Sequence, residues 1–346
     1  MTTSLFSASG KSQDNDPGAG PAAPVTAAAR VRGAVTVVMT RYVVVPILIG
    51  LIIYTEINDH LFLTWSSIKV VLSDNASIGL IAVGLTPVLL AGGFDISVGS
   101  VYAGGASVYT TMGMHEPLVL ALVIAIVAGI VAGAVNGILT TVFNLNAFVA
   151  TLGTASLFAG LTLAYAGTVA VTPSNPSFPS LGNGAVAGVP YTVVILVAAL
   201  ILGALLVHRT PFGKSLYAIG GSPGASRLVG LPIARYRFIT YLISGGCAAL
   251  AGAIYASQTG VSTTDLGGLY TALTALAMIV LGGTSLYGGE GSMWRTAIGV
   301  LVLAVITNLF NTFSISEAVQ EWVEGLIVLA ALGLDSVIRG QARQGG

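Results

Sequence analysis

The chain has 346 residues, of which 55% are hydrophobic and only 8% are charged, and its mean hydropathy is +0.91. Soluble domains carry about 25% charged residues, so this composition excludes a soluble globular protein and predicts a polytopic membrane protein. The single cysteine, Cys247, excludes a disulfide framework or a cysteine metal cluster. The three histidines, His60, His115 and His208, are scattered, and no catalytic, cofactor or metal site is predicted.

Residues 1–40 are rich in Ala, Gly, Pro, Ser and Asp and are predicted to form a disordered cytosolic N-terminal tail. A helix needs about 20 mostly apolar residues to cross a bilayer, and long apolar runs follow this tail. Residues 41–338 are therefore predicted to form an all-α transmembrane domain, with 339–346 as a cytosolic C-terminal tail. The ten expected spans are 41–57, 68–91, 97–113, 118–140, 147–170, 190–208, 237–257, 269–287, 296–313 and 320–338.

The basic residues set the predicted orientation, because Lys and Arg concentrate in cytosolic loops. With the N-terminus in the cytosol, all of the 13 basic residues except Lys69 fall on or near the cytosolic side. Most acidic residues, including Asp59, Glu116 and Glu324, then fall outside. Both termini in the cytosol require an even number of spans, which agrees with ten.

The fourth expected span carries Gly129, Gly133 and Gly137 at four-residue spacing. This spacing places a smooth stripe on one helix face, where another helix can approach closely. Packing within the chain is the predicted use of the stripe, and a subunit interface is the alternative.

Residues 208–215, HRTPFGKS, end like a phosphate-binding loop. The complete pattern requires a glycine five residues before the glycine of GK, and His208 occupies that position. The segment also does not follow a strand. The chain is therefore not expected to hydrolyse nucleotide by itself.

The surrounding loop, 208–237, is the longest basic internal segment, and it contains the signals of a short helix. Ser222 is a good N-cap, and Pro223 suits the first helical position. Gly230 can end the helix in a left-handed conformation. A short exposed helix of this kind is predicted to dock into a partner's groove, and an ordinary linker turn is the alternative. Its residues of interest are Ser222, Pro223, Ala225, Ser226, Arg227, Leu228 and Gly230.

Two glycine-rich segments share a pattern, LLAGGFDISVGS (89–100) and IVLGGTSLYGGEGS (279–292). Each has paired glycines near its start and Gly-Ser at its end, and each is predicted to break a helix. If the two correspond, spans two to five and seven to ten form an inverted repeat, as in many transporter folds. The residues predicted to form these breaks and their caps are Gly92, Gly93, Asp95, Ser97, Gly282 and Gly283.

Asp95 is the ionisable residue of the first break, where a charged group is costly. The favoured role is the N-cap of the third span, accepting hydrogen bonds from backbone amides that would otherwise lack partners. Direct contact with a solute or ion is one alternative, and pairing with another side chain is the other.

Further polar and aromatic side chains are candidates for lining a path for a hydroxyl-rich solute. Asn308 and Asn311 share one face of the ninth span, but hydrogen bonding between helices is the favoured role for both. Residues at the start of the fifth span face the same ambiguity. The candidates for lining the path are Asn146, Phe148, Thr151, Thr284, Asn308 and Asn311.

Over residues 65–338, the chain resembles the permease subunits of bacterial ribose-type sugar ABC importers, which serve ribose, arabinose, xylose, galactofuranose and autoinducer-2. The segments that carry this resemblance are NASIGLIAVGLTPVLLAGGFDISVGS (75–100), NLNAFVATLGT (144–154), RTPFGKSLYAIGGSPGASRLVGLPIARYR (209–237) and LGGTSLYGGEGS (281–292). The combination of the early GG-x-D-x-S-V-G-S run with the late LGGTSL-x-GG run is specific.

The resemblance implies a fold similar to vitamin B12-importer-type permeases, in a bacterial cytoplasmic membrane. It implies three protein partners besides membrane lipid: an ATPase subunit, usually with tandem nucleotide-binding domains; a second permease copy or a sister permease; and a periplasmic or lipid-anchored sugar-binding protein. Nucleic acid is not among the expected partners. The short helix at 223–229 then corresponds to the coupling helix that meets the ATPase.

The function implied is inward transport of a monosaccharide or similar polyol by alternating access, driven by the separate ATPase. Where family members often carry acidic residues before the late LGG run, this chain has Ala272 and Thr274. That departure weakens any assignment of the sugar by analogy. An ion-coupled secondary transporter and a passive channel are the rival classes.

Overall fold

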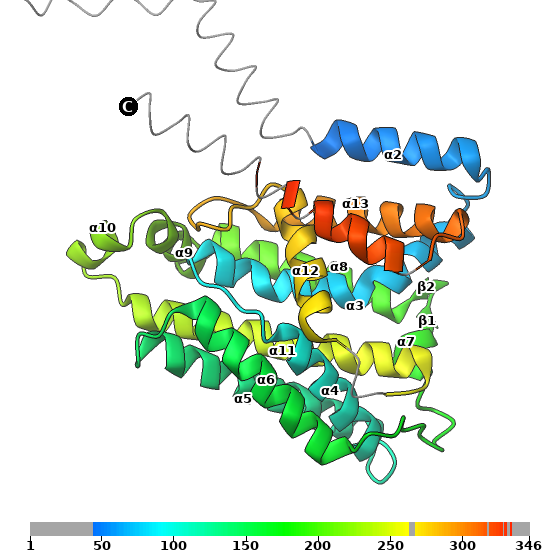
Figure 1. Cartoon of the computed structure of the whole chain (residues 1–346), viewed down its shortest axis with the longest axis horizontal. Helices are drawn as coiled ribbons and strands as arrows, with labels where there is room; N and C mark the ends of the chain where they lie inside the picture. The colour runs from blue at the N-terminus through cyan, green and yellow to red at the C-terminus, as the bar shows by residue number, and fades with distance from the viewer. Residues whose placement is uncertain (1–43, 263–266, 317, 328, 331–332, 334–346) are drawn as a thin grey trace, which may run out of the picture. The chain divides into compact units, whose positions relative to one another are not determined.

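The computed structural model describes residues 44–262, 267–316, 318–327, 329–330 and 333. The predicted tails, 1–40 and 339–346, lie outside the described residues. The regular secondary structure of the described part is α-helical except for one small hairpin and an isolated β-bridge between Val171 and Ser262 (Figure 1).

The helices follow the apolar runs closely, because each run that can satisfy its backbone only internally folds as a helix in an apolar medium. The long helices are α2 (Val44–Asn58), α3 (Trp65–Leu90), α4 (Val98–Met112), α5 (Leu118–Thr141), α6 (Ala147–Ala166), α8 (Tyr191–Arg209), α11 (Ile233–Thr259), α12 (Gly268–Leu281) and α13 (Met293–Thr312). The shorter elements are α7 (Ser180–Asn183), β1 (Ala185–Val186), β2 (Val189–Pro190), α9 (Pro211–Gly221) and α10 (Pro223–Leu228). Residues 318–327 are also helical.

Six of the described helices are long and apolar enough to cross a membrane: α3, α5, α6, α8, α11 and α13. The apolar helices α2 and α12 are shorter, with 15 and 14 residues, and so is α4, with 15. Helices α4 and α12 are short because of the glycine-rich breaks: α4 begins after the first break, and α12 ends at the second. The predicted span 269–287 therefore ends at Leu281 instead of running on to 287.

The core forms around α3 and α11, and α11 packs against α3, α4 and α5. In the apolar stretch of each central helix, more than half of the residues are buried, 61% in α3 and 56% in α11. The corresponding share is 22% in each of α5, α6 and α8. The outer helices instead expose apolar side chains such as Val131, Leu161 and Leu202. An outer face of this composition suits lipid rather than water, so the chain is an all-α integral membrane protein.

The glycine stripe of α5 is the seam along which α5 meets α11. A Cβ atom at Gly133 would overlap the carbonyl oxygen of Tyr241, and one at Gly129 would overlap the carbonyl oxygen of Gly245. These glycines let the two backbones touch, which is the usual role of small residues between membrane helices. The prediction that the stripe packs within the chain is confirmed.

This seam gives a prediction in which the sign of the effect depends on position. Gly133→Ala is expected to destabilise the protein by about 1–3 kcal/mol, because the new methyl meets backbone that cannot move aside. Gly153→Ala on α6 is the matched control: no atom lies within 4 Å of its new Cβ. That control should be neutral or stabilising by about 0.5–1 kcal/mol, since alanine is the better helix former. Thermal unfolding in detergent measures both, and equal midpoints for the two variants would contradict the seam.

Candidate functional site

The segment α9–α10 lies at one end of the long helices, and the β1–β2 hairpin lies at the other (Figure 1). Helix α10 has the boundaries that the sequence indicates. The Ser222 hydroxyl accepts a hydrogen bond from the amide of Ala225 at 3.3 Å, and Pro223 occupies the first turn. Gly230 follows with φ +76°, and the amides of Gly230 and Leu231 donate back to the carbonyls of Arg227 and Ser226. This pair of backbone hydrogen bonds is a Schellman motif, so hydrogen bonds fix both ends of a very short helix.

The outward face of α10 carries two apolar side chains at its tip. Leu228 is 90% exposed and Val229 is 76% exposed, whereas Ser226 is only 3% exposed. The predicted docking residue Ser226 is thus turned toward the protein, because it occupies the inner side of the single turn. The end of α10 thus presents two adjacent apolar side chains to solvent.

The first break begins where α3 ends at Leu90. Gly92 adopts φ +70°, the chain then runs without regular structure, and α4 begins at Val98 with Ser97 as its N-cap. The prediction that Asp95 is that N-cap is wrong. Asp95 lies before the cap, and its Oδ1 accepts from the amide of Ser97 at 3.1 Å and from the Ser97 hydroxyl at 2.7 Å. The carboxylate therefore closes a local turn that aims α4.

Asp95 also joins this turn to two other helices. Its Oδ2 accepts from the Ser244 hydroxyl on α11 at 2.9 Å, and its Oδ1 accepts from Nδ2 of Asn136 on α5 at 3.4 Å. The same Nδ2 donates to the Ser97 hydroxyl at 2.6 Å, and Oδ1 of Asn136 accepts from Thr154 on α6. Asp95 is 3% exposed and Asn136 is fully buried. This is the third of the possible roles, pairing with other side chains, and it leaves the carboxylate little surface for a solute.

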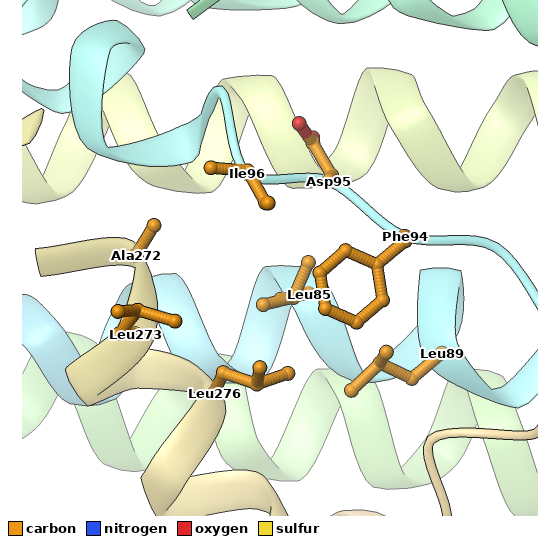
Figure 2. Close-up of a pocket in the computed structure, with 8 residues that line it drawn as sticks. All are labelled: Leu85, Leu89, Phe94, Asp95, Ile96, Ala272, Leu273 and Leu276. Carbon is orange, nitrogen blue, oxygen red and sulfur yellow. The ribbon is translucent and has the colours of Figure 1, made fainter. Parts of the chain in front are cut away.

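A small cavity lies beside the break, between α3, the 94–96 segment and α12 (Figure 2). Its volume is about 10 Å³, room for roughly one water molecule. Figure 2 shows Phe94 directed toward Leu85 and Leu89, while the Asp95 carboxylate points away from them. This cavity is therefore apolar on its α3 side and too small for a sugar.

One face of α11 holds the first break along its length. Arg237 donates from Nε to the carbonyl of Ala91 at 3.1 Å, and the Tyr241 hydroxyl donates to the carbonyl of Phe94 at 3.1 Å. Ser244 completes the row with its bond to Asp95. Spacings of four and three residues place all three donors on one side of the helix. Carbonyls that the break frees from helical bonding thus find donors, as buried backbone requires.

The second break is held in a similar way by α9, the helix that precedes α10 in the chain. Gly282 is the C-cap of α12, Gly283 has φ +87°, and Ser292 accepts from the Arg295 amide to cap α13. The Tyr217 hydroxyl on α9 donates to the carbonyl of Gly291 at 2.9 Å. Burial raises the pKa of Tyr217, with a smaller opposing effect from Arg295, so the hydroxyl keeps the proton that it donates.

The two breaks touch each other at a junction made of glycines. The amide of Gly289 donates to the carbonyl of Leu90 at 3.0 Å. A Cβ at Gly220, in the last turn of α9, would overlap Leu90 and Gly289, and one at Gly288 would crowd Gly92. A side chain has no space at this junction, so here the backbones of both breaks and of α9 are in direct contact.

The residues predicted to line a path do not form one cluster. Asn146 caps α6, Phe148 packs its ring 5.7 Å from that of Phe94, and Thr151 accepts from the Ile96 amide at 3.2 Å. These three lie at or near the first break. Thr284 is in the second break, 2% exposed, and its hydroxyl has no hydrogen-bond partner within the described residues.

Asn308 and Asn311 are near the far end of α13, with Asn308 about 24 Å along the helix from Ser292. Gln320 donates to Oδ1 of Asn311 at 3.4 Å, whereas Oδ1 of Asn308 is buried without a partner in the described part of the chain.

Sequence reasoning missed several residues of this arrangement. Asn136 sits within the glycine stripe, and Ser244 lies in an apolar run, so their polarity was the available signal. Glu324, which the charge distribution places toward the outer side of the membrane, is 5% exposed within the chain, and it accepts from the Tyr270 hydroxyl at 2.9 Å and the Thr274 hydroxyl at 3.0 Å. Its carboxylate thus lies against one of the two positions where the resemblance leads one to expect acids.

The fold and these breaks define the class as a multi-pass, all-α integral membrane protein with interrupted helices. The chain belongs to the family described as "Branched-chain amino acid transport system / permease component", whose profile matches residues 67–332. This membership confirms that the chain is a transport permease and not an enzyme. No solved structure matches it.

Several curated relatives of the chain are bacterial sugar permeases. The chain is 39% identical to the ribose import permease protein of Bacillus subtilis over 289 residues, covering 82% of this chain and 89% of the relative. It is 37% identical to the L-arabinose transport system permease protein of Escherichia coli K12, covering 74% and 78%. It is 29% identical to the D-allose transport system permease protein of the same strain, covering 83% and 88%. The resemblance to ribose-type sugar ABC importers is confirmed.

Proposed function

We propose that this chain is the transmembrane subunit of an ATP-binding-cassette importer and moves a monosaccharide or similar small polyol inward. The observation that carries the proposal is the 39% identity to a ribose import permease over 82% of the chain. The two helix breaks support it, because irregular backbone at membrane depth is tolerated only where it packs in protein or lines a cavity.

The proposed topology has ten spans, with both termini in the cytosol of a bacterial inner membrane. In this proposal the ten spans are the six long helices, the three shorter ones and the helix at 318–327. The positions of α10 and the hairpin at opposite ends of the long helices support a cytosolic 208–237 loop and an outer hairpin (Figure 1). The inverted repeat and the vitamin B12-importer-type fold belong to the same proposal.

The transport mechanism we propose is alternating access driven from outside the chain. An ATPase subunit with tandem nucleotide-binding domains engages α10 through Leu228 and Val229. ATP binding closes those domains and moves α10, which switches the pathway between its outward and inward states. A second permease copy or a sister permease completes the pathway, and a sugar-binding protein delivers the solute.

The rival function is an ion-coupled secondary transporter. Asp95 and Glu324 are the observations that favour it, because carboxylates buried in a membrane domain are candidates for binding a coupling ion. In the part of the chain that the structure describes, the donors to both carboxylates are hydroxyls, a side-chain amide and a backbone amide, which is the pattern of structural pairing.

Uptake in proteoliposomes separates the two functions. The permease is reconstituted with its ATPase and binding protein, and radiolabelled ribose, arabinose and allose are offered with internal or external ATP or with a proton or sodium gradient. The expected result is saturable uptake of one of these sugars that requires ATP on the ATPase side and the binding protein. Uptake driven by an ion gradient without the ATPase would establish the rival, and ATP-independent, non-saturable flux would establish a channel.

A further inference from the structure

The loop that carries α10 is connected to both helix breaks, and neither connection is required merely to expose a docking helix. On one side, α9 and α10 share Ser222, which is the C-cap of the first and the N-cap of the second. On the other side, the Schellman motif and the short segment 229–232 join α10 to α11. Because no flexible linker separates the three helices, a displacement of α10 moves the adjoining ends of α9 and α11.

Each of these two helices holds one break through a side-chain hydroxyl or guanidinium. Tyr217 on α9 donates to Gly291 of the second break. Arg237 and Tyr241 on α11 donate to Ala91 and Phe94 of the first break. All three acceptors are backbone carbonyls in non-helical segments, so these bonds fix the position of the backbone in each break and do not depend on its side chains.

The glycine junction prevents the breaks from moving independently. Gly289 donates to Leu90, and Gly220 of α9 leaves no space for a side chain between them. A shift of α9 relative to α11 must therefore displace both breaks or separate this contact. Close-packed backbone behaves as a rigid body or rearranges discretely, and it does not stretch continuously.

We infer that Tyr217, Arg237 and Tyr241 are positioning residues that transmit movement of α10 to both helix breaks at once. The inference rests on the proposed function, in which an ATPase moves α10. None of the three residues lies on α10, the proposed docking helix. Their removal should uncouple ATP hydrolysis from transport while leaving docking intact.

The test is the number of ATP molecules hydrolysed per sugar molecule imported in the reconstituted complex. The variant is Tyr217→Phe with Tyr241→Phe, which deletes one donor to each break and keeps both rings. Thr192→Val is the matched control: it deletes a buried hydrogen bond of 2.8 Å to Ser73, between α3 and α8 and outside the breaks. Association with the ATPase and thermal stability are measured for all three proteins.

The double variant is expected to bind the ATPase and hydrolyse ATP normally while importing sugar at least about ten-fold more slowly, the scale of two lost net hydrogen bonds. Thr192→Val is expected to keep the wild-type ratio. A double variant with an unchanged ratio, whether both rates stay normal or fall together, would overturn the inference. A wild-type complex without ATP-dependent uptake would instead refute the proposed function, and this outcome is recognisable without any variant.

Hydrogen exchange on the wild-type complex gives a second measurement that does not depend on a variant folding. Addition of ATP should change the exchange of the amides in 91–97 and 283–291 together with those of α10. Exchange that changes in α10 while both breaks stay constant would show that the movement is not transmitted.

Discussion

Replacing Leu228 and Val229 with Asp is expected to abolish association with the ATPase and, with it, ATP-dependent uptake. The two side chains are 90% and 76% exposed on a helix whose ends are both fixed, so the substitution removes apolar surface without disturbing a core. Full burial of a Leu or Val side chain contributes about 1.5–3 kcal/mol. Loss of both side chains from the interface therefore weakens association by about a hundred-fold or more. Co-purification and surface plasmon resonance against the ATPase measure the effect.

Val186→Asp is the control for this double variant. Val186 is also an exposed apolar residue, but it lies in the hairpin at the other end of the long helices (Figure 1). It should leave association with the ATPase unchanged. Normal association of the Leu228→Asp/Val229→Asp protein with the ATPase would show that α10 is not the docking helix. Substitutions of the buried Ser226 are a poorer test, because they disturb packing behind the helix as well.

Asp95→Leu is expected to prevent stable folding or assembly, whereas Asp95→Asn should retain most of both. Leucine offers no acceptor, so three buried donors would lose theirs: the Ser97 amide, the Ser97 hydroxyl and the Ser244 hydroxyl. Each buried donor that loses its acceptor costs about 1–3 kcal/mol, so the sum approaches the whole stability of a typical domain. An asparagine keeps one acceptor oxygen for Ser97, and its amide can donate to the Ser244 oxygen after the hydroxyl turns.

Size-exclusion chromatography and thermal unfolding in detergent measure this difference. Ser244→Ala is the graded control: it removes one donor, leaves Oδ2 of Asp95 without that bond, and should cost about 1.5–3 kcal/mol, less than the loss of the whole carboxylate. If Asp95→Leu folded and assembled normally but changed sugar selectivity, the carboxylate would be a solute ligand and the structural role would be wrong.

The contacts between α9 and the two breaks explain why the breaks are rich in glycine. Gly92, Gly283 and Gly288 adopt positive φ, where other residues are strained, and Gly220 lies where any Cβ would meet backbone. The glycines therefore serve close contact between segments as well as turning. This explains why the two breaks resemble each other in sequence although their intervals differ.

Much of the architecture follows from local sequence alone. Apolar runs of span length give the helices, because a backbone in lipid must bond within its own segment. The ends of α10 were also predictable, since Ser222, Pro223 and Gly230 act on groups within a few residues of themselves. The glycine stripe of α5 indicated a close helix contact, although it could not name α11 as the partner.

The partners of the polar residues were decided only by the tertiary structure. Asp95 meets Ser244 across 149 positions of sequence, and Tyr217 meets Gly291 across 74. Glu324 is buried against the hydroxyls of Tyr270 and Thr274 on α12, 54 and 50 positions away in sequence. Local signals determine which segments are helices and where these end, because capping and hydrogen bonding within a helix span only a few residues. They cannot determine which buried donor meets which acceptor, because that depends on how distant helices pack against α3 and α11.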